Sequence, residues 1–149
     1  MKNYSIIGKP ISHSLSPKLH NYWFRENKID CHYDKISPNE DEIKKIIEKI
    51  KNKEIHGINV TVPFKQTVIP FLETLSDTAT KTNSVNTIFI KNGKIHGDNT
   101  DVYGFEKSIL NNNINLKNKS ALINFWCRWS CVINYFGPSN SKNRKNLYF

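Results

Sequence analysis

The sequence predicts a three-layer α/β domain with a mixed, mainly parallel sheet and a C-terminal hairpin, followed by the start of a second α/β domain. Strand-like segments alternate with helical patterns, and strands joined through helices pair in parallel. Asn92-Gly93 is a strong hairpin signal, because both residues adopt positive φ readily. The expected strands cover residues 4–8, 31–36, 55–62, 85–91, 94–98 and 121–123.

Residues 57–65 (GINVTVPFK) combine a strand with its end. Isoleucine and valine alternate with polar residues there, as in a half-buried strand. Pro63 ends the strand because it has no N–H to donate to a neighbouring strand. A helix interrupted at Pro70 is expected over 64–72, with Lys65 in its first turn. The helix dipole disfavours a cation at that position, which suits the Lys65 ammonium to proton transfer.

Helix signals separate the other strands. Ser16 can cap a helix that has Pro17 at its first position. Isoleucines recur at helical spacing in residues 41–51, which predicts an amphipathic helix with one buried face. A short helix is expected over 76–82, and a longer helix opens at Asp101.

Composition limits the class of protein. A hydrophobic fraction of 38% supports one small core, and no apolar run approaches the roughly 18 residues of a membrane span. The first residues lack the features of a signal peptide, so a cytoplasmic location without membrane contact is expected. The three cysteines, Cys31, Cys127 and Cys131, suit neither a disulfide framework nor a zinc site, and no metal is expected.

The net charge of +9 does not by itself indicate nucleic-acid binding. Arg128, Lys142, Arg144 and Lys145 supply +4 of it within residues 125–149, which contain no acidic residue. Lysine, asparagine and isoleucine are abundant, as in the products of A/T-rich coding sequences. We interpret the basic surface as solvated. A small nucleic-acid binder stays an alternative, and steep salt dependence would reveal it.

Polar side chains from several loops are expected at one edge of the sheet. In open α/β sheets, ligands bind at the carboxyl ends of the strands. The loops contribute hydroxyls, carboxamides, an ammonium and a carboxylate, which suit a small polyhydroxylated anion. The candidate residues are Ser14, Ser16, Asn59, Thr61, Lys65, Asn86 and Asp101.

Each candidate also has a purely local interpretation. Ser16 can cap a helix, and Asp101 can complement the charge of its helix. Asn86 can satisfy the hairpin backbone, and Thr61 can be an ordinary strand residue. The local interpretation is weakest for Lys65, because Thr61 lies with it around the same strand end.

Four motifs occur in order along the chain. They are PISHSLSP at residues 10–17, NVTVPFK at 59–65, VNT at 85–87 and GDNTDVYG at 97–104. Over residues 4 to about 110 the sequence resembles the shikimate dehydrogenase family. Asn83-Ser84 stands where this family usually has Gly-Ala, a small departure that should not disturb binding.

The resemblance implies NADPH-dependent reduction of 3-dehydroshikimate to shikimate, a step of aromatic amino-acid (chorismate) biosynthesis. It implies that Lys65 and Asp101 are the catalytic pair beside the substrate carbonyl and manage the proton together. It also implies that Ser14 and Ser16 hold the substrate carboxylate, and that Thr61 and Asn86 assist. The implied substrate-binding set is Ser14, Ser16, Asn59, Thr61, Lys65, Asn86 and Asp101. Shikimate and 3-dehydroshikimate are the implied partners, and a family homodimer stays open.

Two other functions stay open beside this one. A quinate/shikimate dehydrogenase that uses NAD would share these motifs, because the residues that choose between NAD and NADP would lie beyond residue 149 in frame. A non-catalytic substrate-binding fragment would also keep Lys65 and Asp101.

The family pattern breaks after residue 123. The family continues with a Rossmann NADP-binding domain, in which a strand leads into a Gly-Ala-Gly-Gly loop. Here residues 124–131 read NFWCRWSC instead. Tryptophan has the single codon TGG, which restricts what a reading frame shifted one base later from Phe125 can encode. The shifted frame gives five residues in turn: first Phe or Ser, second Gly, third Ala or Val, fourth a residue that can be Gly, and fifth Gly. We therefore interpret the residues after about 124 as out of frame, with no cofactor-binding residue retained.

The expected organisation has three parts. A shikimate-binding catalytic domain covers 1–101, and an interdomain helix and linker cover 102–117. Residues 118–149 hold the first strand of a lost NADP-binding domain and the out-of-frame tail, for which a divergent extension is the alternative. This chain is then expected to be inactive, although its family is enzymatic.

An independent DNA read across codons 118–150 tests the reading frame. We expect one base fewer near codon 124, and a frame that then continues through Gly-x-Gly-Gly into a dinucleotide-binding domain. A read that reproduces the extra base would rule out a sequencing error and identify a truncated gene product.

Overall fold

The computed structural model describes residues 1–112, 121–124 and 132–135, with side chains for residues 1–112. Its strands are β1 (Lys2–Ile7), β2 (Cys31–Ile36), β3 (Gly57–Val60), β4 (Thr74–Leu75), β5 (Thr87–Lys91), β6 (Lys94–Asp98), β7 (Ala121–Asn124) and β8 (Val132–Tyr135). Its α-helices are α1 (Ser16–Glu26), α2 (Ile43–Lys51), α3 (Asp77–Thr82) and α4 (Asp101–Asn111), and short 3-10 helices cover Glu40–Glu42 and Ile69–Phe71.

Strands β1 to β6 form one sheet in the order β2-β1-β3-β5-β6-β4. β1 pairs in parallel with β2 and β3, and β4 pairs in parallel with β6. β5 runs antiparallel to both β3 and β6. The mixed, mainly parallel sheet with its C-terminal hairpin is thus confirmed. β7 forms at the predicted place and pairs antiparallel with β8 in a separate sheet.

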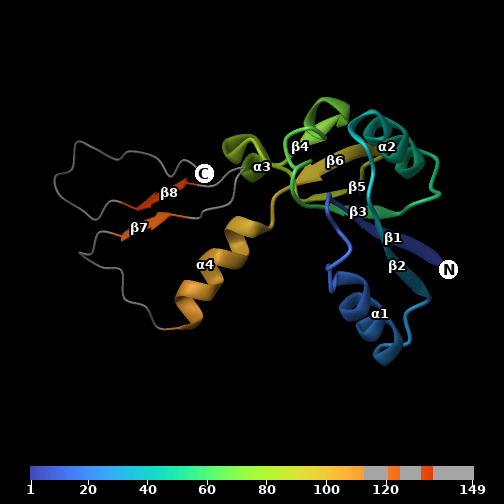
Figure 1. Ribbon diagram of the computed structural model, residues 1–149, viewed down its shortest axis with the longest axis horizontal. Helices are drawn as coiled ribbons and strands as arrows, with labels where there is room; N and C mark the ends of the chain where they lie inside the picture. The colour runs from blue at the N-terminus through green and yellow to red at the C-terminus, as the bar shows by residue number, and fades with distance from the viewer. Residues whose placement is uncertain (113–120, 125–131, 136–149) are drawn as a thin grey trace.

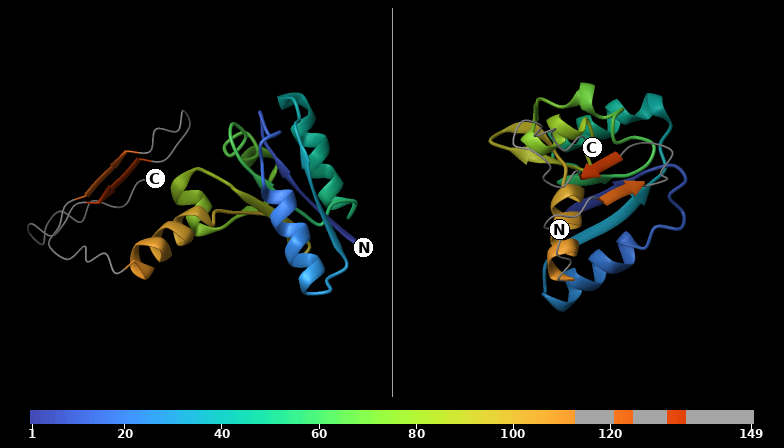
Figure 2. Two further views of the ribbon diagram at one scale, coloured as in Figure 1. Left: turned by 60° about the horizontal axis from the view of Figure 1, so that its bottom comes forward. Right: turned by 90° about the vertical axis from the view of Figure 1, so that its left-hand side faces the viewer.

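Helices cover both faces of the large sheet, which gives the predicted three layers (Figures 1 and 2). α1 lies on one face, whereas α2 and α3 lie on the other (Figure 1). α4 leaves the end of β6 and runs away from the sheet (Figure 1). No helix of the described residues is long and apolar enough to cross a membrane.

The main core lies between the sheet and α2. The four isoleucines predicted to form the buried face of this helix are all buried, namely Ile43, Ile46, Ile47 and Ile50. They cluster with Ile7, Ile58 and Val60 of the central strands. Burial of each such side chain contributes about 1.5–3 kcal/mol, so this face anchors α2 to the sheet.

The opposite face is covered more sparsely, because no residue of α1 is fully buried. This helix is attached to the edge strand β2 by the Asn21 carboxamide. Its Oδ1 accepts from the Tyr33 N–H at 2.9 Å, and its Nδ2 donates to the Tyr33 carbonyl at 2.7 Å. The His20 ring stacks on the Tyr33 ring with centroids 4.2 Å apart and an interplanar angle of 10°. The outer edge of β2 is thereby closed at Tyr33.

The α-helix predicted over 64–72 is wrong. The segment consists of turns, with a single i to i−4 hydrogen bond from the Val68 N–H to the Phe64 carbonyl, and only Ile69–Phe71 forms a 3-10 helix. The Lys65 carbonyl, which would accept from residue 69 in an α-helix, accepts instead from the Val85 N–H at 2.9 Å. Ser16 also differs from its predicted role, because Leu15 is the N-cap of α1 and no side chain caps it.

Truncation of Ile47 tests the main core. Ile47 is 1% exposed, so Ile47→Ala should lower the free energy of unfolding by about 2–5 kcal/mol through lost burial and a residual cavity. Urea unfolding followed by circular dichroism measures this. Lys45→Ala, on the exposed side of the same helix, is the matched control and should change stability by about 0.5 kcal/mol or less. Equal unfolding midpoints for the two variants would contradict the described core.

Tyr33 gives a pH-dependent test of the α1 side. Burial raises the pKa of Tyr33 to about 12, whereas an exposed tyrosine titrates near about 10. Its stabilising contribution should therefore be complete below about pH 10 and lost as the pH rises through about 12, because the unfolded chain loses the proton first. The difference in tyrosinate absorbance between the wild type and Tyr33→Phe should titrate near pH 12. Tyr22→Phe, which removes an exposed phenol, is the matched control and should keep the absorbance change near pH 12.

Candidate active site

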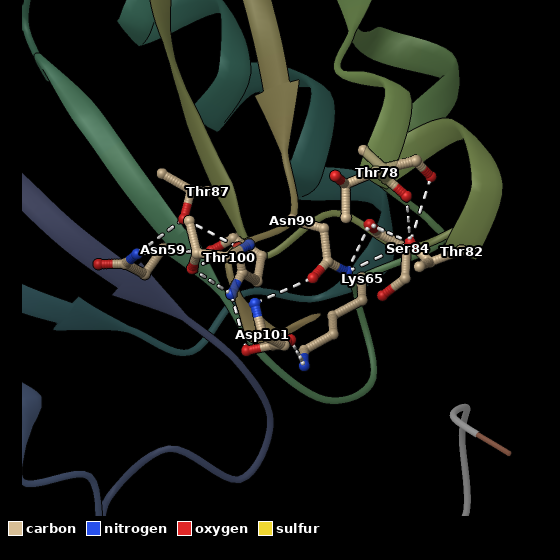
Figure 3. Close-up of polar contacts among 11 residues, drawn as sticks. Asn59, Lys65, Thr78, Thr82, Ser84, Thr87, Asn99, Thr100 and Asp101 are labelled. Atoms are coloured by element: carbon tan, nitrogen blue, oxygen red, sulfur yellow. Dashed lines mark hydrogen bonds and ion pairs between the residues drawn. The ribbon is translucent and has the colours of Figure 1, made fainter. Parts of the chain in front are cut away.

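An ion pair joins two of the predicted residues. The Lys65 Nζ donates to the Asp101 Oδ2 at 2.8 Å (Figure 3). Lys65 lies in the turns after β3, and Asp101 is the first residue of α4, where a helix N-terminus favours a negative charge. Their side chains are 25% and 49% exposed, so the pair adds little to stability. Both charged groups remain accessible from solvent.

Asn86 holds the second oxygen of the same carboxylate. Its Nδ2 donates to the Asp101 Oδ1 at 2.8 Å and to the Thr100 Oγ1 at 2.9 Å. Its Oδ1 accepts from the Thr100 N–H at 3.0 Å. Each oxygen of Asp101 therefore has its own donor, and one amide side chain ties the start of β5 to the start of α4.

A buried hydrogen-bond network centred on Asn99 holds the backbone of Asp101. Asn99 is 4% exposed, and its Oδ1 accepts from the Asp101 N–H at 3.0 Å. Its Nδ2 donates to the Ser84 carbonyl at 2.9 Å and to the Thr82 Oγ1 at 3.3 Å (Figure 3). Asn99 belongs to the GDNTDVYG motif, but the motif alone assigns it no role. The sequence feature that could have pointed to Asn99 is its position between a hairpin strand and the start of a helix.

The αL conformation of Asn83, with φ 48°, explains the departure at 83–84. Asn83 is the C-cap of α3 and takes the left-handed conformation that glycine adopts most easily. Asparagine is among the residues that tolerate this conformation best. The exchange of Gly for Asn therefore leaves the backbone path to Asn86 intact.

Asn59 connects the cluster to the far edge of the sheet. Its Nδ2 donates to the Thr87 Oγ1 at 3.3 Å and to the Asn86 carbonyl at 3.4 Å. Its Oδ1 accepts from the Tyr33 hydroxyl at 2.6 Å. Tyr33 is not among the residues predicted from the sequence, because only the folded sheet brings β2 to within two strand positions of β3.

Three hydroxyl residues lie near the ends of β1 and β3 and are all partly buried. Ser14 is in the loop after β1, Ser16 is the first residue of α1, and Thr61 directly follows β3. The Ser14 Oγ accepts from the Ser16 N–H at 3.3 Å. The two loops are joined by a hydrogen bond from the Lys9 N–H to the Val62 carbonyl at 3.0 Å. Within residues 1–112, no hydrogen bond links these three hydroxyls to Lys65 or Asp101.

Gly8 allows the two loops to approach closely. A Cβ atom at Gly8 would lie 2.5 Å from the Thr61 Cγ2 and 2.9 Å from the Ile11 Cδ1. Because contacts under 3.0 Å are too short, any other residue here would force at least the Thr61 side chain to move. The absence of a side chain at Gly8 therefore lets the loop after β1 lie close to the end of β3.

The environment of Lys65 differs from the expected one. Residues 64–68 form turns and not an α-helix, so the helix-dipole argument for Lys65 does not apply. The Asp101 carboxylate beside its ammonium now accounts for its position.

Among the described residues, no group of three or more His, Cys, Asp or Glu side chains could hold a metal ion. Most of the predicted out-of-frame tail, with Cys127 and Cys131, lies outside the described residues.

Comparisons with known proteins agree with the motifs. A family model of the shikimate dehydrogenase substrate binding domain matches residues 6–88. The shikimate dehydrogenase (NADP(+)) of Pelagibacter ubique is 51% identical over 122 residues, which make up 82% of this chain and 46% of that relative. The chain thus spans about half the length of the curated relatives it matches.

Solved structures give the same result. Shikimate dehydrogenase from Aquifex aeolicus is 41% identical and superposes with a TM-score of 0.72 over 79% of this chain and 44% of that chain. Shikimate 5-dehydrogenase from Listeria monocytogenes, solved in complex with shikimate and NAD, is 27% identical, with a TM-score of 0.73 over 79% of this chain and 41% of that chain. Because the family model matches more than half of its residues, the chain belongs to the shikimate dehydrogenase family.

Proposed function

We propose that residues 1–101 bind shikimate and 3-dehydroshikimate, and that the activity of the whole protein is NADPH-dependent reduction of 3-dehydroshikimate to shikimate. The observation that carries this proposal is the Lys65–Asp101 pair at 2.8 Å, with Asn86 on the second carboxylate oxygen at 2.8 Å. A pair of this kind can bind a hydroxyl or carbonyl oxygen and move a proton at that oxygen.

The charge of Lys65 defines its proposed role. In the reducing direction, the Lys65 ammonium donates a hydrogen bond to the substrate carbonyl oxygen and supplies the proton that the oxygen needs as the alcohol forms. Asp101 keeps the ammonium in place and, in the oxidising direction, helps to take up the proton of the alcohol. NADPH, when bound, supplies the hydride.

The other predicted residues, except Asn59, contact the substrate directly in this proposal. Ser14, in the loop after β1, and Ser16, at the start of α1, hold its carboxylate. Thr61 and Asn86 contribute to its carboxylate and hydroxyls. Asn59 does not contact the substrate in this proposal, because both ends of its carboxamide are hydrogen-bonded inside the protein. It acts indirectly, through its hydrogen bonds to Thr87 and Asn86.

The division of the chain is also a proposal. We divide the chain into a substrate-binding unit over 1–101, a connecting helix and linker over 102–117, and the beginning of a nucleotide-binding unit from 118. This division fits the start of α4 at Asp101 and the presence of the strand β7. Use of NAD is the second candidate for the cofactor, supported by the relative from Listeria monocytogenes that was solved with NAD.

Shikimate binding by residues 1–149 tests the proposed site. Titration of the 15N-labelled chain with shikimate should shift the amide signals of Lys65, Asn86 and Asp101. Lys65→Ala should weaken binding about tenfold or more, because it removes a charged hydrogen-bond donor. Lys81→Ala removes an exposed lysine of α3 and is the matched control, with unchanged affinity expected. Absence of shifts in the wild type would overturn the proposed binding site.

The same chain should not oxidise NADPH in the presence of 3-dehydroshikimate. Residues 1–149 contain six glycines but no G-x-G-x-x-G pattern for the pyrophosphate. NADPH absorbance, with an intact shikimate dehydrogenase as positive control, measures this. Turnover above background in purified chain would contradict the expectation.

A further inference from the structure

We propose that Tyr33, on the edge strand β2, is a positioning residue that holds the Asp101 carboxylate beside Lys65. It acts through a relay of three polar side chains, which are Asn59, Thr87 and Asn86. The inference rests on the proposed function, because the position of Asp101 matters for catalysis only if the pair handles substrate.

The direction of the relay is fixed at the Asp101 end. The Thr100 N–H can only donate, so the atom of Asn86 that it meets at 3.0 Å must be Oδ1. The Nδ2 of Asn86 therefore faces the Asp101 carboxylate, which can only accept. A rotated Asn86 would place its oxygen against that carboxylate and lose the hydrogen bond.

The next two links follow from this orientation. The Thr87 Oγ1 lies 3.0 Å from the Asn86 Oδ1 and must donate to it. The Asn59 atom 3.3 Å from the same hydroxyl must then be a donor, Nδ2. Figure 3 shows the Asn59 nitrogen turned toward Thr87 and its oxygen turned away. That oxygen needs a donor, and the Tyr33 hydroxyl supplies it at 2.6 Å.

The surroundings of Tyr33 hold its hydroxyl in place as a hydrogen-bond donor. It is 3% exposed, its ring is stacked on His20, and its backbone is held by Asn21. Burial raises the pKa of Tyr33 to about 12, so the hydroxyl keeps its proton in the neutral range. The phenol reaches across β1 from β2 to β3, which links the edge of the sheet to the site.

A simpler interpretation is that Asn59 merely satisfies a buried phenol. The two interpretations differ in what removal of the hydroxyl does. In a relay, Asn59 becomes free to rotate and present its Oδ1 to Thr87. The Thr87 proton then turns toward Asn59, and Asn86 loses a donor to its Oδ1. In the simpler interpretation the change stops at Asn59.

The test uses the 15N-labelled 1–149 chain with shikimate as the probe. Tyr33→Phe should shift the side-chain amide signals of Asn86 and the backbone N–H signal of Thr100 in the free protein. It should also weaken shikimate binding about two- to tenfold, the effect of one hydrogen bond. Tyr4→Phe is the matched control, because Tyr4 lies on the neighbouring strand with ring contacts to Phe24 and His56 and no hydroxyl hydrogen bond within residues 1–112. It should change neither readout.

A double-mutant cycle separates a relay from general loosening of the fold. Thr87→Val breaks the same chain one step closer to Asp101. If the links act in series, the double variant Tyr33→Phe/Thr87→Val binds shikimate no more weakly than Thr87→Val alone. Additive losses, or Tyr33→Phe spectra that change only around Asn59, would overturn the proposal.

The free-protein signals keep this inference separate from the proposed function. If the wild type fails to bind shikimate, the proposed function fails, and the Asn86 and Thr100 signals of Tyr33→Phe still decide the relay. If shikimate binds equally well to the wild type and to Tyr33→Phe, and the Asn86 signals are unchanged, the relay fails and the binding site stands.

Discussion

Asn86 is the point at which three chain segments are joined. Its N–H donates to the Asp98 carbonyl at 3.0 Å, and its carbonyl accepts from the Val60 N–H at 2.8 Å. Its side chain reaches Asp101 at 2.8 Å. The end of β3, the start of β5 and the end of β6 therefore lie together at one edge of the sheet. The antiparallel β5–β6 hairpin makes this arrangement possible, because it returns the chain so that α4 begins beside the turn that carries Lys65.

The forces that stabilise this edge differ from the groups that would do chemistry there. Lys65 and Asp101 are partly exposed, and an exposed ion pair contributes little free energy. Asn99, Thr82 and Ser84 are almost fully buried, and a buried polar group without a partner costs about 1–3 kcal/mol. The buried network thus holds the backbone of Asp101 firmly, while its carboxylate stays available to a ligand.

Local patterns predicted the elements whose stability depends on local features. The isoleucines of α2 and the Asn92-Gly93 turn, with φ of 52° and 76°, are such cases. The helix expected after Pro63 failed because the Lys65 carbonyl is taken by Val85, a residue twenty positions away that no local pattern reveals. Tyr33 and Asn99 were missed for the same reason, since their roles arise from contacts across the sheet. The candidate residues themselves came from motifs, and the structure joins Lys65, Asn86 and Asp101 directly.

The exposure of the pair also bears on what residues 1–112 can do alone. In water-rich surroundings, the attraction between an ammonium and an oxyanion is several times weaker than in a closed, dry site. With Lys65 25% and Asp101 49% exposed, hydrogen bonds to a substrate can form, but the field on a reacting carbonyl stays screened. For the proposed reduction, a covering surface that excludes water would strengthen both the Lys65 hydrogen bond and the electrostatic stabilisation of the developing alkoxide. Binding and turnover therefore make different demands on this site, and positioning of Asp101 through Asn86 serves both.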